Sequence, residues 1–177
     1  MRIGDREIEW DRCEALEELG KHLPPASFKV GSLAIERVWD KPSRRGATRP
    51  HFLIHTREGV SSLHTQDSGG SGSQIFSLPF RPDEERVFIS IVNDSANSVE
   101  KDISYPIGRG VAPIVKEKLE LAAHGAHVHE IDLTALRNGG FEGPMLLVRL
   151  SKGPARKVHL IFANPDLSIL SIDHLAG

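Results

Sequence analysis

The chain has 177 residues, with 22 Lys and Arg against 24 Asp and Glu, so its formal net charge is −2 with histidine neutral. This length fits a domain with a substantial core, and the near-zero charge argues against binding of nucleic acid through bulk phosphate attraction. One cysteine, Cys13, excludes an internal disulfide and a cysteine-based zinc or iron–sulfur site, whereas nine histidines stand out in the composition.

We expect neither a signal peptide nor a membrane span. The first residues, Met1 to Glu7, become charged at once, which is unlike an apolar leader. No apolar stretch approaches the roughly 18 residues that a membrane-crossing helix needs. The expected location is therefore the cytoplasm, with no membrane partner.

An amphipathic helix over 5–23 is the first predicted element. Its apolar positions recur at helical spacing, at Ile8, Leu16, Leu19 and Leu23. Strands come next, over 28–38, 51–56, 60–64, 75–80 and 86–92. Both faces of 86–92 are apolar, which predicts a place in the interior of a sheet.

The second half of the chain begins with a predicted loop over 93–110, the one candidate for an internal domain boundary. A second helix is predicted over 112–124, where apolar residues form a stripe and Gly125 ends the helix with a positive φ angle. Strands are expected over 126–133, 145–150, 157–162 and 167–172. The strands 145–150 and 157–162 are predicted to form a hairpin across 151–155.

Short connections between strands dominate this pattern, so a doubly wound parallel sheet is not expected. We predict an α+β fold in a single compact domain over 1–177. It has a mainly antiparallel or mixed sheet of about eight strands, with two helices.

Histidines gather in one segment, 124–130. Strand geometry puts His127 and His129 on the same face, because side chains alternate along a strand. Two imidazoles placed in this way suit a zinc, copper, iron or nickel ion, with His124, His159 or His174 as a further ligand. A pair of half-buried histidines that bonds only to backbone or water is the plainer interpretation. We expect no cofactor, with a divalent transition metal such as zinc as the alternative.

Two charged segments are candidates for partner binding. The predicted first helix carries an acidic face, which suits a basic protein partner attracted by charge steering. The loop 41–50 is basic and suits an acidic protein surface or a phosphate. The residues concerned are Glu14, Glu17, Glu18, Arg44, Arg45 and Arg49. Both segments are equally typical of solvated surface.

No complete catalytic set and no cofactor-binding loop is found, and the Gly/Ser segment 67–73 is typical of a flexible linker. We therefore expect a non-enzymatic protein-binding module of inhibitor, immunity or adaptor type, whose partner is another protein rather than nucleic acid. The first alternative is a metal-dependent enzyme that uses His127 and His129. The second is a domain that binds a small ligand between the sheet and the helix 112–124. Paired edge strands would also allow a homodimer.

Overall fold

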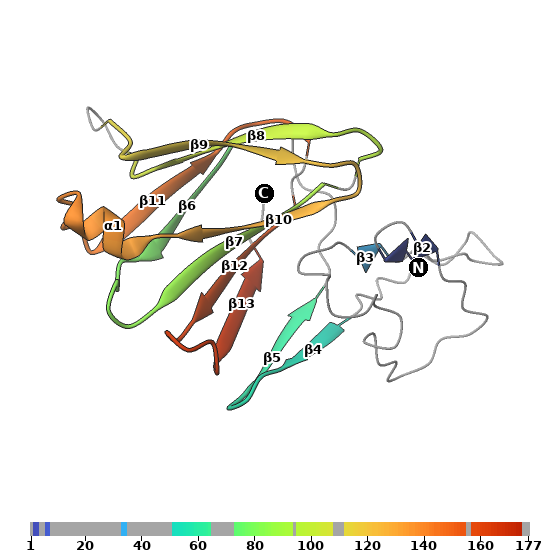
Figure 1. Ribbon diagram of the computed structural model, residues 1–177, viewed down its shortest axis with the longest axis horizontal. Helices are drawn as coiled ribbons and strands as arrows, with labels where there is room; N and C mark the ends of the chain where they lie inside the picture. The colour runs from blue at the N-terminus through green and yellow to red at the C-terminus, as the bar shows by residue number, and fades with distance from the viewer. Residues whose placement is uncertain are drawn as a thin grey trace, which may run out of the picture.

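Two four-stranded antiparallel sheets dominate the fold (Figure 1). The computed structural model describes residues 2–3, 6–7, 33–34, 51–64, 73–93, 95–107, 112–154 and 157–174. The β6/β9 sheet has, in spatial order, β6 (Gln74–Pro79), β11 (Met145–Leu150), β8 (Val99–Tyr105) and β9 (Val115–Leu121). The β10/β13 sheet has β10 (Ala126–Ile131), β7 (Arg86–Val92), β12 (Lys157–Ala163) and β13 (Leu170–His174). Each sheet is named here by its two edge strands.

The two sheets face each other, and side chains from both inner faces form one hydrophobic core (Figure 1). In β11, exposed and buried residues alternate, and the buried ones are Leu146, Val148 and Leu150. This alternation is what a strand with one face on the core requires. Removing a Leu or Ile side chain of this kind from water is worth roughly 1.5–3 kcal/mol. The architecture is therefore a β-sandwich.

The prediction that 86–92 lies inside a sheet is confirmed. β7 pairs antiparallel with β10 on one side and with β12 on the other. Its inner-face residues Val87, Ile89 and Ile91 are fully buried, and the residues between them are half-buried. The predicted predominance of antiparallel pairing also holds, since every strand pair in the described residues is antiparallel.

The prediction of a helix over 112–124 is wrong, because β9 occupies Val115–Leu121. Leu119 and Leu121 point into the core, and Glu117 stands at the inward position before them, where an apolar residue would be typical. Because Glu117 is polar, the sequence of β9 does not show the alternation of apolar and polar residues that is typical of a strand. Gly125 likewise has no positive φ angle; the residue with φ of 53° in the turn after β9 is His124.

The predicted loop over 93–110, the candidate domain boundary, contains β8. This strand lies in the middle of its sheet, between β11 and β9. Its inward residues include Lys101, which is only 1% exposed. The Lys101 ammonium donates to the backbone carbonyls of Ser151 and Gly153 at 2.9 and 3.1 Å. A lysine at an inward position explains why the strand does not show in the sequence pattern.

The predicted hairpin between 145–150 and 157–162 is also wrong, although both strands exist. β11 belongs to the β6/β9 sheet and β12 to the β10/β13 sheet, so the connection at 151–156 crosses from one layer to the other. Each strand needs a buried face, and a crossing lets both faces point into the same core.

One helix is found in the described residues, α1 (Leu133–Asn138), at one end of the sandwich (Figure 1). The Asp132 side chain caps it by accepting from the Ala135 amide at 2.8 Å. Leu133 and Leu136 of α1 are buried in the core. The predicted helix over 5–23 lies outside the described residues except for Arg6–Glu7, which form a short strand. No helix among the described residues is long and apolar enough to cross a membrane.

Two smaller sheets complete the described structure. β1 (Arg2–Ile3), β2 (Arg6–Glu7) and β3 (Leu33–Ala34) form one, and the hairpin β4 (His51–His55) with β5 (Val60–His64) forms the other. β5 lies beside β13 (Figure 1). The hairpin turn is attached to the turn before β13, because the Glu58 amide donates to the Ser168 carbonyl at 3.1 Å and Arg57 pairs with Asp166.

A buried asparagine organises the turns at one end of the sandwich. The side-chain amide nitrogen (Nδ2) of the fully buried Asn93 donates to the backbone carbonyls of Asn97 and Ala122 at 2.8 and 2.7 Å. Its side-chain oxygen accepts from the Ser95 amide and hydroxyl at 3.1 and 2.7 Å. The connections from β7 to β8 and from β9 to β10 are thereby joined through one side chain.

Asn93→Ala leaves several of these buried polar groups without a partner, so we expect it to lower the free energy of unfolding by about 2–4 kcal/mol. Asn97→Ala is the matched control, because Asn97 is exposed; we expect a change within about 0.5 kcal/mol. Urea denaturation of the wild type and both variants measures the difference. Equal effects at the two positions would contradict the assignment.

Candidate functional site

The described structure brings together only part of the predicted metal-ligand set. His127 and His129 share the inner face of β10, opposite Ile91 and Ile89 of β7. His159 lies between the inward residues Val158 and Leu160, on the outer face of the same sheet.

His124 stands in the turn before β10, at a left-handed backbone position. Among the described residues, no group of three or more His, Cys, Asp or Glu side chains is arranged to hold a metal ion. A metal bound by the His127/His129 pair would therefore take its remaining ligands from elsewhere.

The predicted partner-binding residues Glu14, Glu17, Glu18, Arg44, Arg45 and Arg49 all lie outside the described residues. Their roles stay predictions. The third hypothesis, a small ligand between the sheet and a helix over 112–124, loses its site because that segment contains the strand β9.

His129 instead belongs to a polar array that links the two sheets. The Tyr105 hydroxyl of β8 lies 3.1 Å from His129 Nε2, and Glu117 Oε2 of β9 lies 3.6 Å from His129 Nδ1. Tyr105 is 2% exposed and His129 is 9% exposed. Two members come from the β6/β9 sheet and one from the β10/β13 sheet, so the contacts cross the core where β9 and β10 are neighbours.

The charges at this array follow from burial. Burial is the main cause that raises the pKa of Tyr105, and the nearby carboxylates of Glu117 and Asp132 raise it further. A phenol held neutral can donate its proton to Nε2 of His129, and the ring tautomer that accepts it there carries its own proton on Nδ1, on the side of Glu117.

Burial also lowers the pKa of His129, and His127 adds to this, while the Glu117 carboxylate acts in the opposite direction. The hydrogen bond between Tyr105 and His129 thus joins two neutral side chains, and a buried, protonated phenol is a poor nucleophile.

The lowered pKa of His129 predicts an acid-sensitive stability. Since the folded-state pKa lies below the unfolded value near 6.5, the unfolded chain takes up the proton first as the pH falls. The stabilisation is therefore complete above about pH 6.5 and declines as the pH drops toward the folded-state pKa. We expect the difference in unfolding free energy between wild type and His129→Gln to shrink over this interval.

Urea denaturation between pH 5 and 8 measures this difference, with His55→Gln, an exposed position on the β4–β5 hairpin, as the control. A difference that does not vary with pH at His129 would show that its protonation is not linked to folding. Glu117→Gln should lower the His129 pKa further in an NMR titration, because the carboxylate favours the charged ring.

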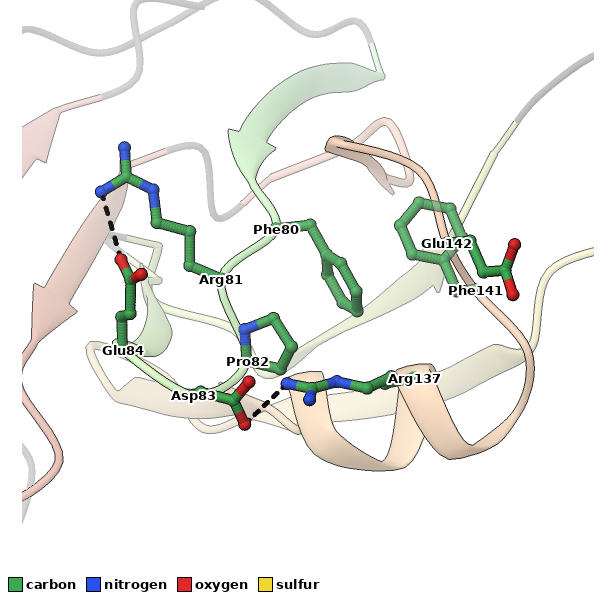
Figure 2. Close-up of a pocket in the computed structure, with 8 residues that line it drawn as sticks. All are labelled: Phe80, Arg81, Pro82, Asp83, Glu84, Arg137, Phe141 and Glu142. Atoms are coloured by element: carbon green, nitrogen blue, oxygen red, sulfur yellow. Dashed lines mark ion pairs between the residues drawn. The ribbon is translucent and has the colours of Figure 1, made fainter.

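A second feature is a surface hollow between the turn after β6 and the end of α1 (Figure 2). Phe80 and Phe141 meet edge to face on one side of it, with ring centroids 4.8 Å apart. Figure 2 shows the Arg137 side chain reaching from α1 to Asp83, at 2.8 Å. This bond is the main cause that lowers the pKa of Asp83.

Most charged side chains that line the hollow form ion pairs with other side chains of the chain. Arg81 lies 3.8 Å from Glu84 and 3.4 Å from Glu85, and Arg137 is engaged with Asp83. The contacts attach α1 to the turn, which is a structural role.

The edge-to-face ring contact should give Phe80→Leu and Phe141→Leu a coupling of about 1 kcal/mol in a double-mutant cycle of unfolding free energies. Phe80→Leu combined with Phe88→Leu is the control pair. Phe88 lies on the outer face of the other sheet, so those two effects should add. Additivity of the Phe80 and Phe141 effects would contradict a specific ring interaction.

The outer face of the β6/β9 sheet carries a third feature, an apolar strip. It consists of Ile75 on β6 with Met145 and Leu147 on β11, which are 54%, 46% and 38% exposed. These residues share the outer face, because the residues between them, such as Leu146, point into the core. Arg149 follows on the same face of β11, directly opposite Ile75 in the strand pairing. None of the ion pairs found in the described part of the chain uses Arg149.

The other half of this outer face is charged. β9 contributes Lys116, Lys118 and Glu120, and β8 contributes Glu100, whose carboxylate pairs with the Lys118 ammonium at 3.1 Å. The same sheet face is therefore divided between an apolar half at β6–β11 and a hydrated half at β8–β9.

Comparison with protein-family models, curated proteins and solved structures finds no match to this chain.

Proposed function

We propose that this chain is a non-enzymatic protein-binding module and that the apolar strip of Ile75, Met145 and Leu147 is its docking surface. The supporting observation is the exposure of three large apolar side chains on one sheet face, with Met145 and Leu147 two residues apart on β11 and Ile75 of β6 diagonal to Leu147. Single exposed apolar residues are ordinary on protein surfaces, but adjacent ones next to a charged region are typical of interaction sites.

The residues around the strip indicate the chemistry of the partner. Arg149 stands beside Ile75 and has a guanidinium suited to a carboxylate. A partner that presents apolar side chains next to an acidic residue would bury the strip and pair this arginine. Such an arrangement, with an apolar centre and an arginine at its margin, is common at protein interfaces.

The polar array at His129 favours the binding module over the enzymatic alternative. Its phenol is buried and neutral, and its histidine is occupied by the contact between the sheets. The inhibitor, immunity or adaptor class remains part of our proposal, as does a contribution from the acidic segment at Glu14, Glu17 and Glu18.

A strip variant with Ile75→Ser, Met145→Ser and Leu147→Ser tests the proposal. We expect it to weaken binding of the native partner at least about tenfold, since truncation of a single strongly contributing residue near the centre of an interface costs about 2 kcal/mol or more. Lys116→Ser with Lys118→Ser is the matched control on the charged half of the same face, and its affinity should stay within about twofold.

The measurement begins with co-purification from the native host and continues with titration of the purified partner by calorimetry. Unchanged affinity in the strip variant, with the fold intact by circular dichroism, would refute this docking surface. Arg149→Glu should weaken binding and reduce its dependence on salt, because the charge at the margin is reversed.

A further inference from the structure

The edge strand β6 differs from the other edges of the sandwich because it carries no charged residue. Its sequence is Gln-Ile-Phe-Ser-Leu-Pro, over Gln74–Pro79. On one side it pairs with β11, and no other strand in the described residues pairs with its second side. An uncharged open edge is a ready template for another strand.

The other three edges are protected in recognisable ways. β9 alternates charges through Lys116, Glu117, Lys118 and Glu120. β10 carries Glu130, whose carboxylate holds the Arg86 guanidinium at 2.7 and 2.9 Å. β13 has β5 beside it. Lysine, glutamate and a covering hairpin are among the usual means of blocking an edge, and in the described part of the chain β6 has none of these three; its one blocking residue is Pro79, at the end of the strand.

The backbone of β6 shows which groups face the open side. The Phe80 amide donates to the Pro144 carbonyl at 3.1 Å, so the amides of Leu78 and Phe76 point toward β11 in the same register. The amides and carbonyls of Ile75 and Ser77 therefore point away from β11. Pro79 has the same outward orientation, so the open side of β6 offers amide donors at Ile75 and Ser77 but none at Pro79.

We propose that β6 pairs antiparallel with β6 of a second copy of this chain, to give a two-fold dimer with one continuous sheet of eight strands. This inference goes beyond the proposed function, and the dimer would enlarge the same docking surface. The outer faces of the two copies become continuous, so that two apolar strips join at the dimer axis.

A second copy is the occupant that the edge fits best. An antiparallel pair of identical strands offers the same open groups, those of Ile75 and Ser77, from both sides, as a two-fold contact requires. No like charges meet, because β6 has none, and the chain as a whole carries only −2. The exposed Ile75 side chains would gain cover from the neighbouring strand.

Amide exchange read by NMR tests the pairing within one strand. We expect the Ile75 and Ser77 amides to be protected at roughly 500 μM and to exchange freely at roughly 10 μM, as mass action requires for a dimer. The Phe76 and Leu78 amides, bonded to β11, should stay protected at both concentrations and serve as internal controls. Free exchange of Ile75 and Ser77 at both concentrations, or protection that does not depend on concentration, would overturn the proposal.

Sedimentation equilibrium with two edge variants gives an independent measurement. Ser77→Pro removes an outward N–H and spares the bonds to β11, and Ile75→Lys adds a charge to the edge; each should raise the dimer dissociation constant at least about tenfold. Ser77→Ala and Thr134→Lys, on the exposed side of α1, should leave it unchanged. A monomeric wild type at high concentration, or a dimer insensitive to both edge variants, would overturn the pairing.

The two proposals fail in different ways. If Ser77→Pro is monomeric and still binds the native partner, the docking strip stands and the dimer is not needed for it. If the dimer forms as described but the strip variant keeps full affinity for the partner, β6 pairing stands and the proposed docking surface is wrong.

Discussion

Every side chain that points between the two sheets has to be apolar or has to have its polar atoms bonded, because that space excludes water. Most inward positions satisfy this requirement with Leu, Ile or Val. Three of the polar exceptions are Lys101, His129 and Tyr105, and each has a defined partner. The lysine holds the carbonyls of the connection that leads from β11 to β12, and the histidine and tyrosine bond to each other across the sheets. These three buried polar groups therefore lie where the chain crosses between layers or where the layers meet.

The same exceptions explain which elements the sequence reveals. Strands with uniformly apolar inner faces, β7 and β11, are predicted from alternation and hydrophobicity with accurate bounds. β8 and β9 are missed, because Lys101 and Glu117 stand at inward positions and break the alternation. The pattern in 115–121 then resembles a helix, since Val115, Leu119 and Ala122 also match a helical stripe. Missing these two strands also hides the array, since Tyr105 and Glu117 belong to them.

Layer assignment is the other property that local patterns do not determine. A strand with one buried face looks the same in either sheet of a sandwich, and a short connection favours the hairpin interpretation. The order β6-β11-β8-β9 requires that β11, late in the chain, insert between β6 and β8. Among the predicted site residues, alternation correctly places His127 and His129 on one face, but the position of His159 on the opposite face depends on the pairing of β12 with β7.

Alternation of apolar residues defines a strand's register only up to steps of two, because a shift by two residues returns the same face to the core. The contacts among Tyr105, His129 and Glu117 remove that ambiguity for β8, β9 and β10 together. A slip of two residues in β9 would keep an alternating pattern and yet take the carboxylate away from the imidazole. The contacts of His129 with Tyr105 and Glu117 thus specify the strand register. They stabilise the native register over registers shifted by two residues, which hydrophobic burial alone would leave close to it in free energy.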